Sequence, residues 1–95
     1  MTGAMLLERV TPACDLEPRS VARVAGRIVA VQVEPADAAP TVVARIDDGT
    51  GFVHAVFMGR REVPGIEPGR TVDVEGRVCE TTAEPRIYNP RYELR

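Results

Sequence analysis

Residues 47–51 read Asp-Asp-Gly-Thr-Gly and lie between two runs in which apolar and polar residues alternate, TVVARI at 41–46 and FVHAVFM at 52–58. Alternation with a period of two is typical of β-strands, and glycine accepts the positive φ that a tight reversal needs. The three segments therefore predict a β-hairpin. We expect Asp47 and Asp48 to cap its turn rather than to bind a metal ion, which would need more converging oxygens.

One face of this hairpin should meet a core and the other should be free, because successive side chains of a strand point to opposite sides. The parity predicts an inward set of Val42, Ala44, Ile46, Val53, Ala55 and Phe57. The outward set is Val43, Arg45, Asp47, Phe52, His54, Val56 and Met58. A slip of one residue in the register would exchange the two sets.

Three further segments have the composition of strands. The first runs from Ser20 to Val33, is rich in valine and contains Gly26, which indicates a bulge or a sharp bend. The next runs from Arg70 to Glu80, with Val72, Val74 and Val78 on one side and Thr71, Asp73, Glu75 and Arg77 on the other. The last runs from Arg86 to about Leu94 and contains Pro90, which indicates an edge or a bulge.

The segments between these strands are rich in proline, glycine or polar residues. We expect loops at 34–40 and 81–85, and a connection at 59–69 that can hold at most a single helical turn. Tyr92 and Asn89 should be structural, closing the fifth strand against the first.

Five strands, a long bent first strand and an insertion between the third and fourth strands predict an all-β OB-fold, a five-stranded Greek-key barrel. An SH3-like barrel is the alternative. The OB-fold domain should cover residues 19–95. Residues 1–18 should form an N-terminal arm, which can be poorly ordered. Residues 5–10 of this arm can form a turn of helix.

Composition bounds the class of protein. The 95 residues suffice for one domain, and a content of 44% hydrophobic residues is ordinary for a folded chain. The sequence has no long apolar run and no basic region before its first apolar patch, so we expect neither a membrane span nor a signal peptide, and a cytoplasmic location. The net charge of −2 argues against a protein that binds duplex DNA through a large overall positive charge.

All 12 basic residues are arginine. This bias reflects either GC-rich codons or selection for bidentate phosphate contacts, and the sequence does not separate the two.

No catalytic or metal-binding constellation is present in the sequence. Cys14 and Cys79 are far apart and belong to no Cys-x-x-Cys motif, so with the single histidine they fall short of the four ligands of a structural zinc ion. We expect both cysteines to be small apolar filler, unpaired in a reducing compartment. The chain also lacks a Walker-type loop and an HExxH motif. We therefore expect a protein that is not an enzyme and holds no cofactor.

The order of short motifs along residues 20–95 is similar to that of a known family. These motifs are VAGRI at 24–28, DGTG at 48–51, GRR at 59–61, PGIEPG at 64–69, VEGRV at 74–78 and YNPRYEL at 88–94. They resemble a family of small OB-fold nucleic-acid-binding proteins from high-GC bacteria and, more loosely, the tRNA-anticodon-type OB domains. The Asn-Pro-Arg-Tyr ending is similar to the end of the wedge OB domain of a branch-migration helicase. The resemblance implies nucleic-acid binding.

In an OB-fold the ligand crosses the outer face of the second and third strands, flanked by two loops. The candidate residues on or beside this face supply aromatic rings for stacking on bases and guanidinium groups for phosphates. They are Arg45, Phe52, His54, Arg60, Arg61, Arg86 and Tyr88. Five of them have a plainer alternative: Phe52 can cover the barrel end, His54 can face solvent, Arg45 can pair with an acid across the strands, and Arg60 and Arg61 can solvate a loop.

Two functions are therefore predicted. The first is a weak, salt-sensitive, non-catalytic module that binds single-stranded DNA or RNA. The second is a protein-interaction or assembly module that uses the same barrel face or an open strand edge, through which the protein could also form a homodimer. The acidic net charge and the acids of the 34–40 loop favour this second function.

Overall fold

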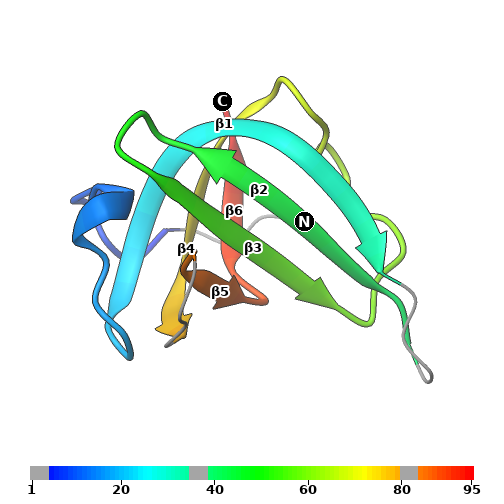
Figure 1. The fold of residues 1–95 in the computed structure, drawn as a ribbon, viewed down its shortest axis with the longest axis horizontal. Coiled ribbons are helices and arrows are strands. Elements are labelled where there is room, and N and C mark those ends of the chain that lie inside the picture. The colour runs from blue at the N-terminus through cyan, green and yellow to red at the C-terminus, as the bar shows by residue number, and fades with distance from the viewer. Residues whose placement is uncertain (1–4, 35–38, 80–83) are drawn as a thin grey trace.

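The structure is a computed structural model that describes residues 5–34, 39–79 and 84–95. Six strands and one short 3-10 helix make up its regular structure (Figure 1). These elements are η1 (Ala13–Asp15), β1 (Val21–Glu34), β2 (Thr41–Asp47), β3 (Phe52–Met58), β4 (Thr71–Cys79), β5 (Arg86–Tyr88) and β6 (Arg91–Leu94). The predicted strands agree with these bounds to within a residue or two at each end, apart from a break in the last strand. Glu80, residues 1–4 of the expected arm and most of the two expected loops lie outside the described residues.

The strands form a closed sheet. Their order is β1-β2-β3-β5-β4-β6, and β4 also pairs with β1, which closes the barrel. The pairing of β3 with β5 is parallel, and the other pairings are antiparallel. A five-stranded Greek-key barrel with this order is the predicted OB-fold, in which β5 and β6 are the two halves of the fifth strand.

The break between β5 and β6 falls at Asn89 and Pro90. Asn89 has a φ of 48°, which asparagine tolerates better than most residues, and Pro90 has no N–H to donate to a sheet. Where the sequence predicts an edge or a bulge at Pro90, the structure has a break in the strand. The expectation that this strand closes against β1 is wrong, because β6 pairs with β4 and β5 pairs with β3 and β4.

β1 serves both halves of the barrel, and Figure 1 shows it arching over β2 and β4. Its first half, residues 21–27, pairs with β4, and its second half, residues 27–34, pairs with β2. A bulge interrupts the register between Ile28 and Ala30. A Cβ on Gly26 would lie 2.7 Å from the carbonyl oxygen of Asp47, so only glycine permits the close approach of the two strands at the bend.

The core follows the predicted parity of the hairpin. All six inward side chains are at most 4% exposed, namely Val42, Ala44, Ile46, Val53, Ala55 and Phe57. β4 contributes Val72, Val74 and Val78 to the same core. The ring of Tyr92 packs edge-on against Phe57 with centroids 5.6 Å apart, and its hydroxyl donates a hydrogen bond to the carbonyl of Pro64.

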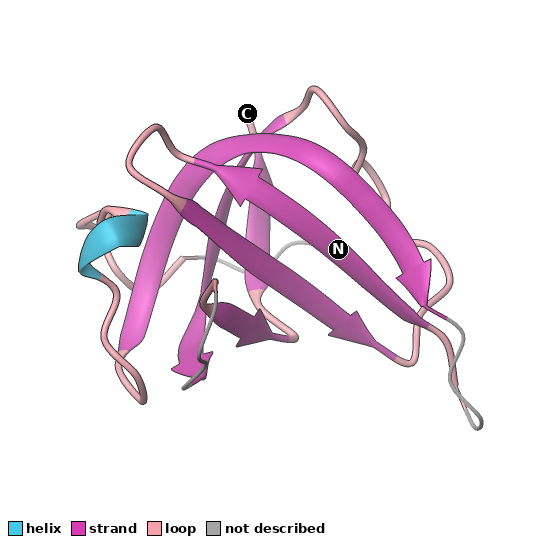
Figure 2. Ribbon diagram, viewed as in Figure 1, coloured by secondary structure: helices cyan, strands magenta, loops and turns pink. Residues whose placement is uncertain are grey.

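Two segments close the ends of the barrel. The connection at 59–70 brings Val63 and Ile66 into the core, and it contains turns but no helix among its residues. Figure 2 shows the 3-10 helix η1 in the N-terminal arm, close to the β2–β3 turn, and not between β3 and β4. Its Ala13 is buried, and Leu16 packs against the core. The helical turn considered for residues 5–10 is not formed.

The arm also covers the outer side of β4. Asp73 and Glu75 point away from the core by parity, yet they are only 2% and 3% exposed. Glu75 accepts hydrogen bonds from the N–H groups of Leu6 and Leu7, and Arg23 donates to the carbonyl of Leu7. Within the described ranges, no helix is long and apolar enough to span a membrane.

Candidate nucleic-acid interface

The outer face of β2, β3 and β5 is arranged in rows across the strands. In the register, Arg45 lies opposite His54, which lies opposite Arg86. These three residues form one row of outward side chains, and Figure 1 shows β2 and β3 crossing in front of β4 and β6. The strand pairing therefore brings together candidates that are far apart in the sequence.

A second row of outward side chains lies on the same face, two residues further along each strand. Gln32, Val43, Val56 and Tyr88 are successive cross-strand neighbours. Val43 and Val56 are buried although they point outward, whereas the Tyr88 side chain is 38% exposed. The second row is thus a short apolar strip on the outer face of the sheet, and it ends at the exposed ring of Tyr88.

Arg45 is held by two neighbours. Its Nε and one terminal nitrogen donate to the two carboxylate oxygens of Glu84 at 2.9 and 2.6 Å. The guanidinium carbon also lies 3.7 Å from the centroid of the Phe52 ring, a cation–π contact. The predicted alternative for Arg45, a pair with an acid, is what the structure shows, although the acid belongs to the chain before β5 and not to a strand.

His54 shares the same carboxylate. Its Nε2 lies 2.7 Å from the Oε1 of Glu84, and its backbone N–H donates to the carbonyl of Pro85. The second bond fixes the chain next to Glu84 against the start of β3. Hydrogen bonds from Arg45 and then from His54 lower the pKa of Glu84 from 4.5 to about 2, so this carboxylate is ionised at neutral pH.

Arg86 and Tyr88 flank the row on the β5 side. Ile87 between them is buried in the core, so both neighbours point outward. Among the described residues, Arg86 has no ion pair. Unlike Arg45, it can therefore bind an anionic ligand without first losing a carboxylate partner among the described residues.

Arg60 and Arg61 lie away from this face. Both are exposed in the connection that follows β3, whereas Phe52 begins that strand. A strand of this length spans roughly 20 Å, so these arginines cannot act on the same phosphate as Arg45. They have no ion pair with another described residue.

The Asp-Asp-Gly-Thr-Gly turn is capped as predicted. Oδ1 of Asp47 accepts the N–H of Gly49, and Oδ1 of Asp48 accepts the N–H groups of Thr50 and Gly51. The partial burial of Asp48 opposes its ionisation, but these hydrogen bonds and one from Ala13 outweigh it and lower its pKa. No cluster of three or more histidine, cysteine or acidic side chains that could hold a metal ion occurs in the described ranges.

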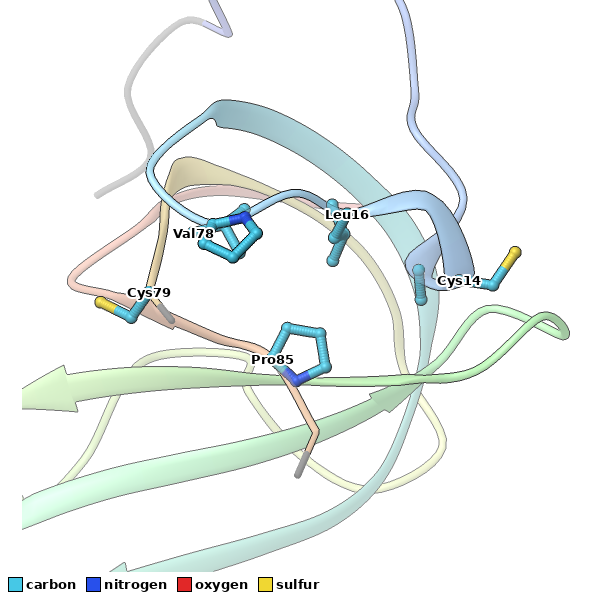
Figure 3. Close-up of a pocket in the computed structure, with 7 residues that line it drawn as sticks. Cys14, Leu16, Val78, Cys79 and Pro85 are labelled. Carbon is cyan, nitrogen blue, oxygen red and sulfur yellow. The ribbon is translucent and has the colours of Figure 1, made fainter. Parts of the chain in front are cut away.

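A separate cavity of about 250 Å³ lies between the arm and the ends of β4 and β5 (Figure 3). Its lining consists of Ala13, Cys14, Leu16, Pro18, Val78, Cys79 and Pro85. None of the described residues that line it is charged. Both cysteines are free; Cys79 is half-buried here, but Cys14 is exposed, so the prediction that Cys14 is apolar filler is wrong.

Two acidic residues take part in contacts that the sequence alone does not predict. Glu84 belongs to the expected 81–85 loop, and the signal that could have found it is an acid at the border of the expected ligand-binding face, a natural partner for Arg45. Asp73 lies on the side of its strand opposite to the core valines, and it accepts hydrogen bonds from Arg23 and Arg95. No local pattern identifies these partners, because Arg23 lies on another strand and Arg95 is the last residue of the chain.

No protein-family model matches this chain, and no curated protein matches it either.

Proposed function

We propose that this protein is a weak, non-catalytic module that binds single-stranded DNA or RNA on the outer face of β2, β3 and β5. The observation that supports it best is the pair formed by Arg86 and Tyr88 on β5. They place a guanidinium without an ion pair, among the described residues, beside an exposed aromatic ring. Both lie on the face where OB-folds bind oligonucleotides.

The composition of the face sets the expected affinity. A base stacked on an aromatic side chain contributes about 1–3 kcal/mol. Tyr88 offers an exposed ring, whereas one side of the Phe52 ring is covered by Arg45. With few stacking sites and a net charge of −2, binding should be weak and should depend strongly on salt.

Fluorescence anisotropy tests this proposal. Labelled oligo(dT) and oligo(U) of about twelve nucleotides, a length that one OB-fold can cover, are titrated with the protein. Titrations at about 50 mM and about 200 mM salt measure the ionic contribution, and a duplex of the same length is the control. We expect micromolar binding to single strands that weakens with salt, and weaker binding to the duplex. The absence of binding at high micromolar protein would refute the proposal.

A protein-interaction role is the second candidate, and one observation favours it. The end of β1 from Val29 to Glu34 lies along one edge: Val29 is in the bulge, residues 30–34 pair with β2, and no second strand pairs with this segment in the part of the chain that is described. Val29 and Val33 on this segment are 42% and 50% exposed. An unpaired edge can accept a strand from another chain. A molar mass that rises with concentration, together with no binding to oligonucleotides, would favour this candidate.

A cytoplasmic location belongs to the same proposal. It is supported by the two free cysteines, which suit a reducing compartment.

A further inference from the structure

Arg45 and His54 form a cradle whose polar groups converge on one carboxylate. They are direct cross-strand neighbours, so their side chains leave the sheet side by side. Three contacts, at 2.9, 2.6 and 2.7 Å, hold the carboxylate of Glu84 between them. Phe52 supports the flat side of the guanidinium at 3.7 Å.

This set of groups suits a phosphate as well as it suits a carboxylate. A guanidinium presents parallel N–H groups that match two oxygens of either anion. An imidazole N–H can donate to the same or to a third oxygen. The oxygens of Glu84 therefore occupy the positions that phosphate oxygens would take.

We propose that Arg45 and His54 are a binding site for a backbone phosphate and that Glu84 is a built-in competitor, which fills this cradle when no ligand is bound. This inference rests on the proposed function, because it names the phosphate subsite on the proposed face. A single strand that binds across β2 and β3 must displace the Glu84 carboxylate before it can reach Arg45.

The exposure of the pair makes this exchange feasible. The side chains of Arg45 and Glu84 are 39% and 31% exposed, so the ion pair is partly hydrated. Exposed pairs of this kind contribute little to stability, and rotation of the Glu84 side chain is enough to open the cradle. The competitor should lower the affinity for a phosphate without abolishing it.

The single histidine provides a direct test that does not depend on nucleic acid. The ring proton signals of His54 are followed by NMR while inorganic phosphate is added at constant pH, with sodium chloride at equal ionic strength as the reference titration. The parent is compared with Glu84→Gln, which removes the competing charge and keeps the side-chain shape. Glu67→Gln is the matched control, because Glu67 is exposed in the turn before β4 and has no ion pair among the described residues.

We expect Glu84→Gln to respond to phosphate at a concentration about three- to fivefold lower than the parent, the effect of removing one exposed ionic competitor. Glu67→Gln should behave like the parent. The double variant Arg45→Ala/Glu84→Gln should lose the response. Equal responses of Glu84→Gln and Glu67→Gln would overturn the inference. A response to phosphate that persists in the double variant Arg45→Ala/Glu84→Gln would also overturn it.

Oligo(dT) binding separates this inference from the proposed function. Tighter binding of Glu84→Gln, with a steeper dependence on salt, supports both. If no variant binds oligo(dT) but Glu84→Gln still binds phosphate at His54, the cradle stands and the nucleic-acid function fails. If oligo(dT) binds through Tyr88 and Arg86 while Glu84→Gln changes neither measurement, the function stands and the competitor role fails.

Discussion

Asp48 joins the β2–β3 turn to the N-terminal arm, because its Oδ2 accepts the N–H of Ala13 at 2.7 Å while its Oδ1 caps the turn. The hydroxyl of Thr50, also bonded to Asp48, accepts the N–H of Cys14. A turn that is 35 residues from Ala13 in the sequence therefore fixes the start of η1 at the end of the barrel.

Removal of this link should free the arm and loosen the turn. We expect Asp48→Ala to lower the free energy of unfolding by about 1–2 kcal/mol, because several hydrogen bonds to one ionised carboxylate are lost. Urea denaturation measures the loss, and hydrogen exchange should show faster exchange at Ala13. Asp47→Ala is the control, since the Asp47 carboxylate caps just one N–H among the described residues, that of Gly49. Equal losses in the two variants would contradict a special role of the link to the arm.

The bend of β1 should not tolerate a side chain at residue 26. A Cβ there would lie 2.7 Å from both the carbonyl oxygen of Asp47 and the Cγ2 of Ile46. We expect Gly26→Ala to destabilise the fold by about 1–3 kcal/mol, the usual effect of overpacking. Gly51→Ala is a matched control, because its Cβ would meet only ordinary contacts at 3.7 Å and beyond. The midpoint of thermal unfolding should fall more for Gly26→Ala than for Gly51→Ala. Equal losses would mean that the loss of a glycine, and not the strand contact, causes the destabilisation.

The two outward residues of β5 should carry much of the affinity for single strands. We expect Tyr88→Ala to weaken oligo(dT) binding by about 1–3 kcal/mol, the contribution of one stacked base, while Tyr88→Phe retains most of it. Arg86→Ala should weaken binding several-fold and reduce its salt dependence. Arg77→Ala is the control for loss of one arginine, because the Arg77 side chain is exposed and its guanidinium donates to the backbone carbonyl of Arg19. Parent-like binding by Tyr88→Ala and Arg86→Ala would place the site elsewhere.

Phe52→Ala and Arg45→Ala should also weaken binding several-fold without unfolding the domain. Phe52 supports the guanidinium of Arg45, so the two substitutions act on one unit and their effects should not add. Anisotropy titrations of both single variants and the double variant test this. Additive losses would show that Phe52 meets a base independently of Arg45.

Acid should remove the contribution of the Glu84 cluster to stability. The pKa of Glu84 is lowered from 4.5 to about 2, so the unfolded chain takes up the proton first as the pH falls. The stabilisation is complete above about pH 4.5 and is lost as the pH falls toward 2. We therefore expect the stability difference between the parent and Glu84→Gln to shrink over this interval. A carboxyl titration of Glu84 by NMR with a midpoint above 4 would contradict the geometry.

Asp73 should make a contribution to stability that depends on pH with the same sign. Hydrogen bonds from Arg95 and then from Arg23 lower its pKa below 3.8 despite its burial. Asp73→Asn should destabilise the fold by about 1–3 kcal/mol above pH 4, because Arg23 loses its charged partner while only 14% exposed. Urea denaturation at neutral and acid pH measures this difference. Arg95→Gln should cost less, since the Arg95 side chain is half exposed.

The sequence alone predicted those features that depend on neighbours along the chain. The alternation at 41–46 and 52–58 identified the inward side chains of the hairpin, because a buried face imposes a period of two. The valine-rich segment with Gly26 identified the bent first strand. The aspartates of the turn were recognised because they bond to their own backbone.

The remaining features depend on contacts between distant segments. Asp73 and Glu75 lie on the side of β4 that faces away from the core. They are nevertheless buried, because Arg95 and the arm cover them. Glu84 lies 39 residues from Arg45, and only the parallel pairing of β3 with β5 places them together. The 3-10 helix formed in the arm rather than before β4, because Val63 and Ile66 fill that end of the barrel without a helix.

The position of β1 in both halves of the barrel has a consequence for how the chain folds. Neither half can form fully on its own, because β1 must contact β2 and also β4, which lies far along the chain. Contacts of high sequence separation slow folding, since the chain must close large loops before it gains their energy. This protein should therefore fold slowly for its length and in one cooperative step, with the docking of β4 onto β1 as the slow event.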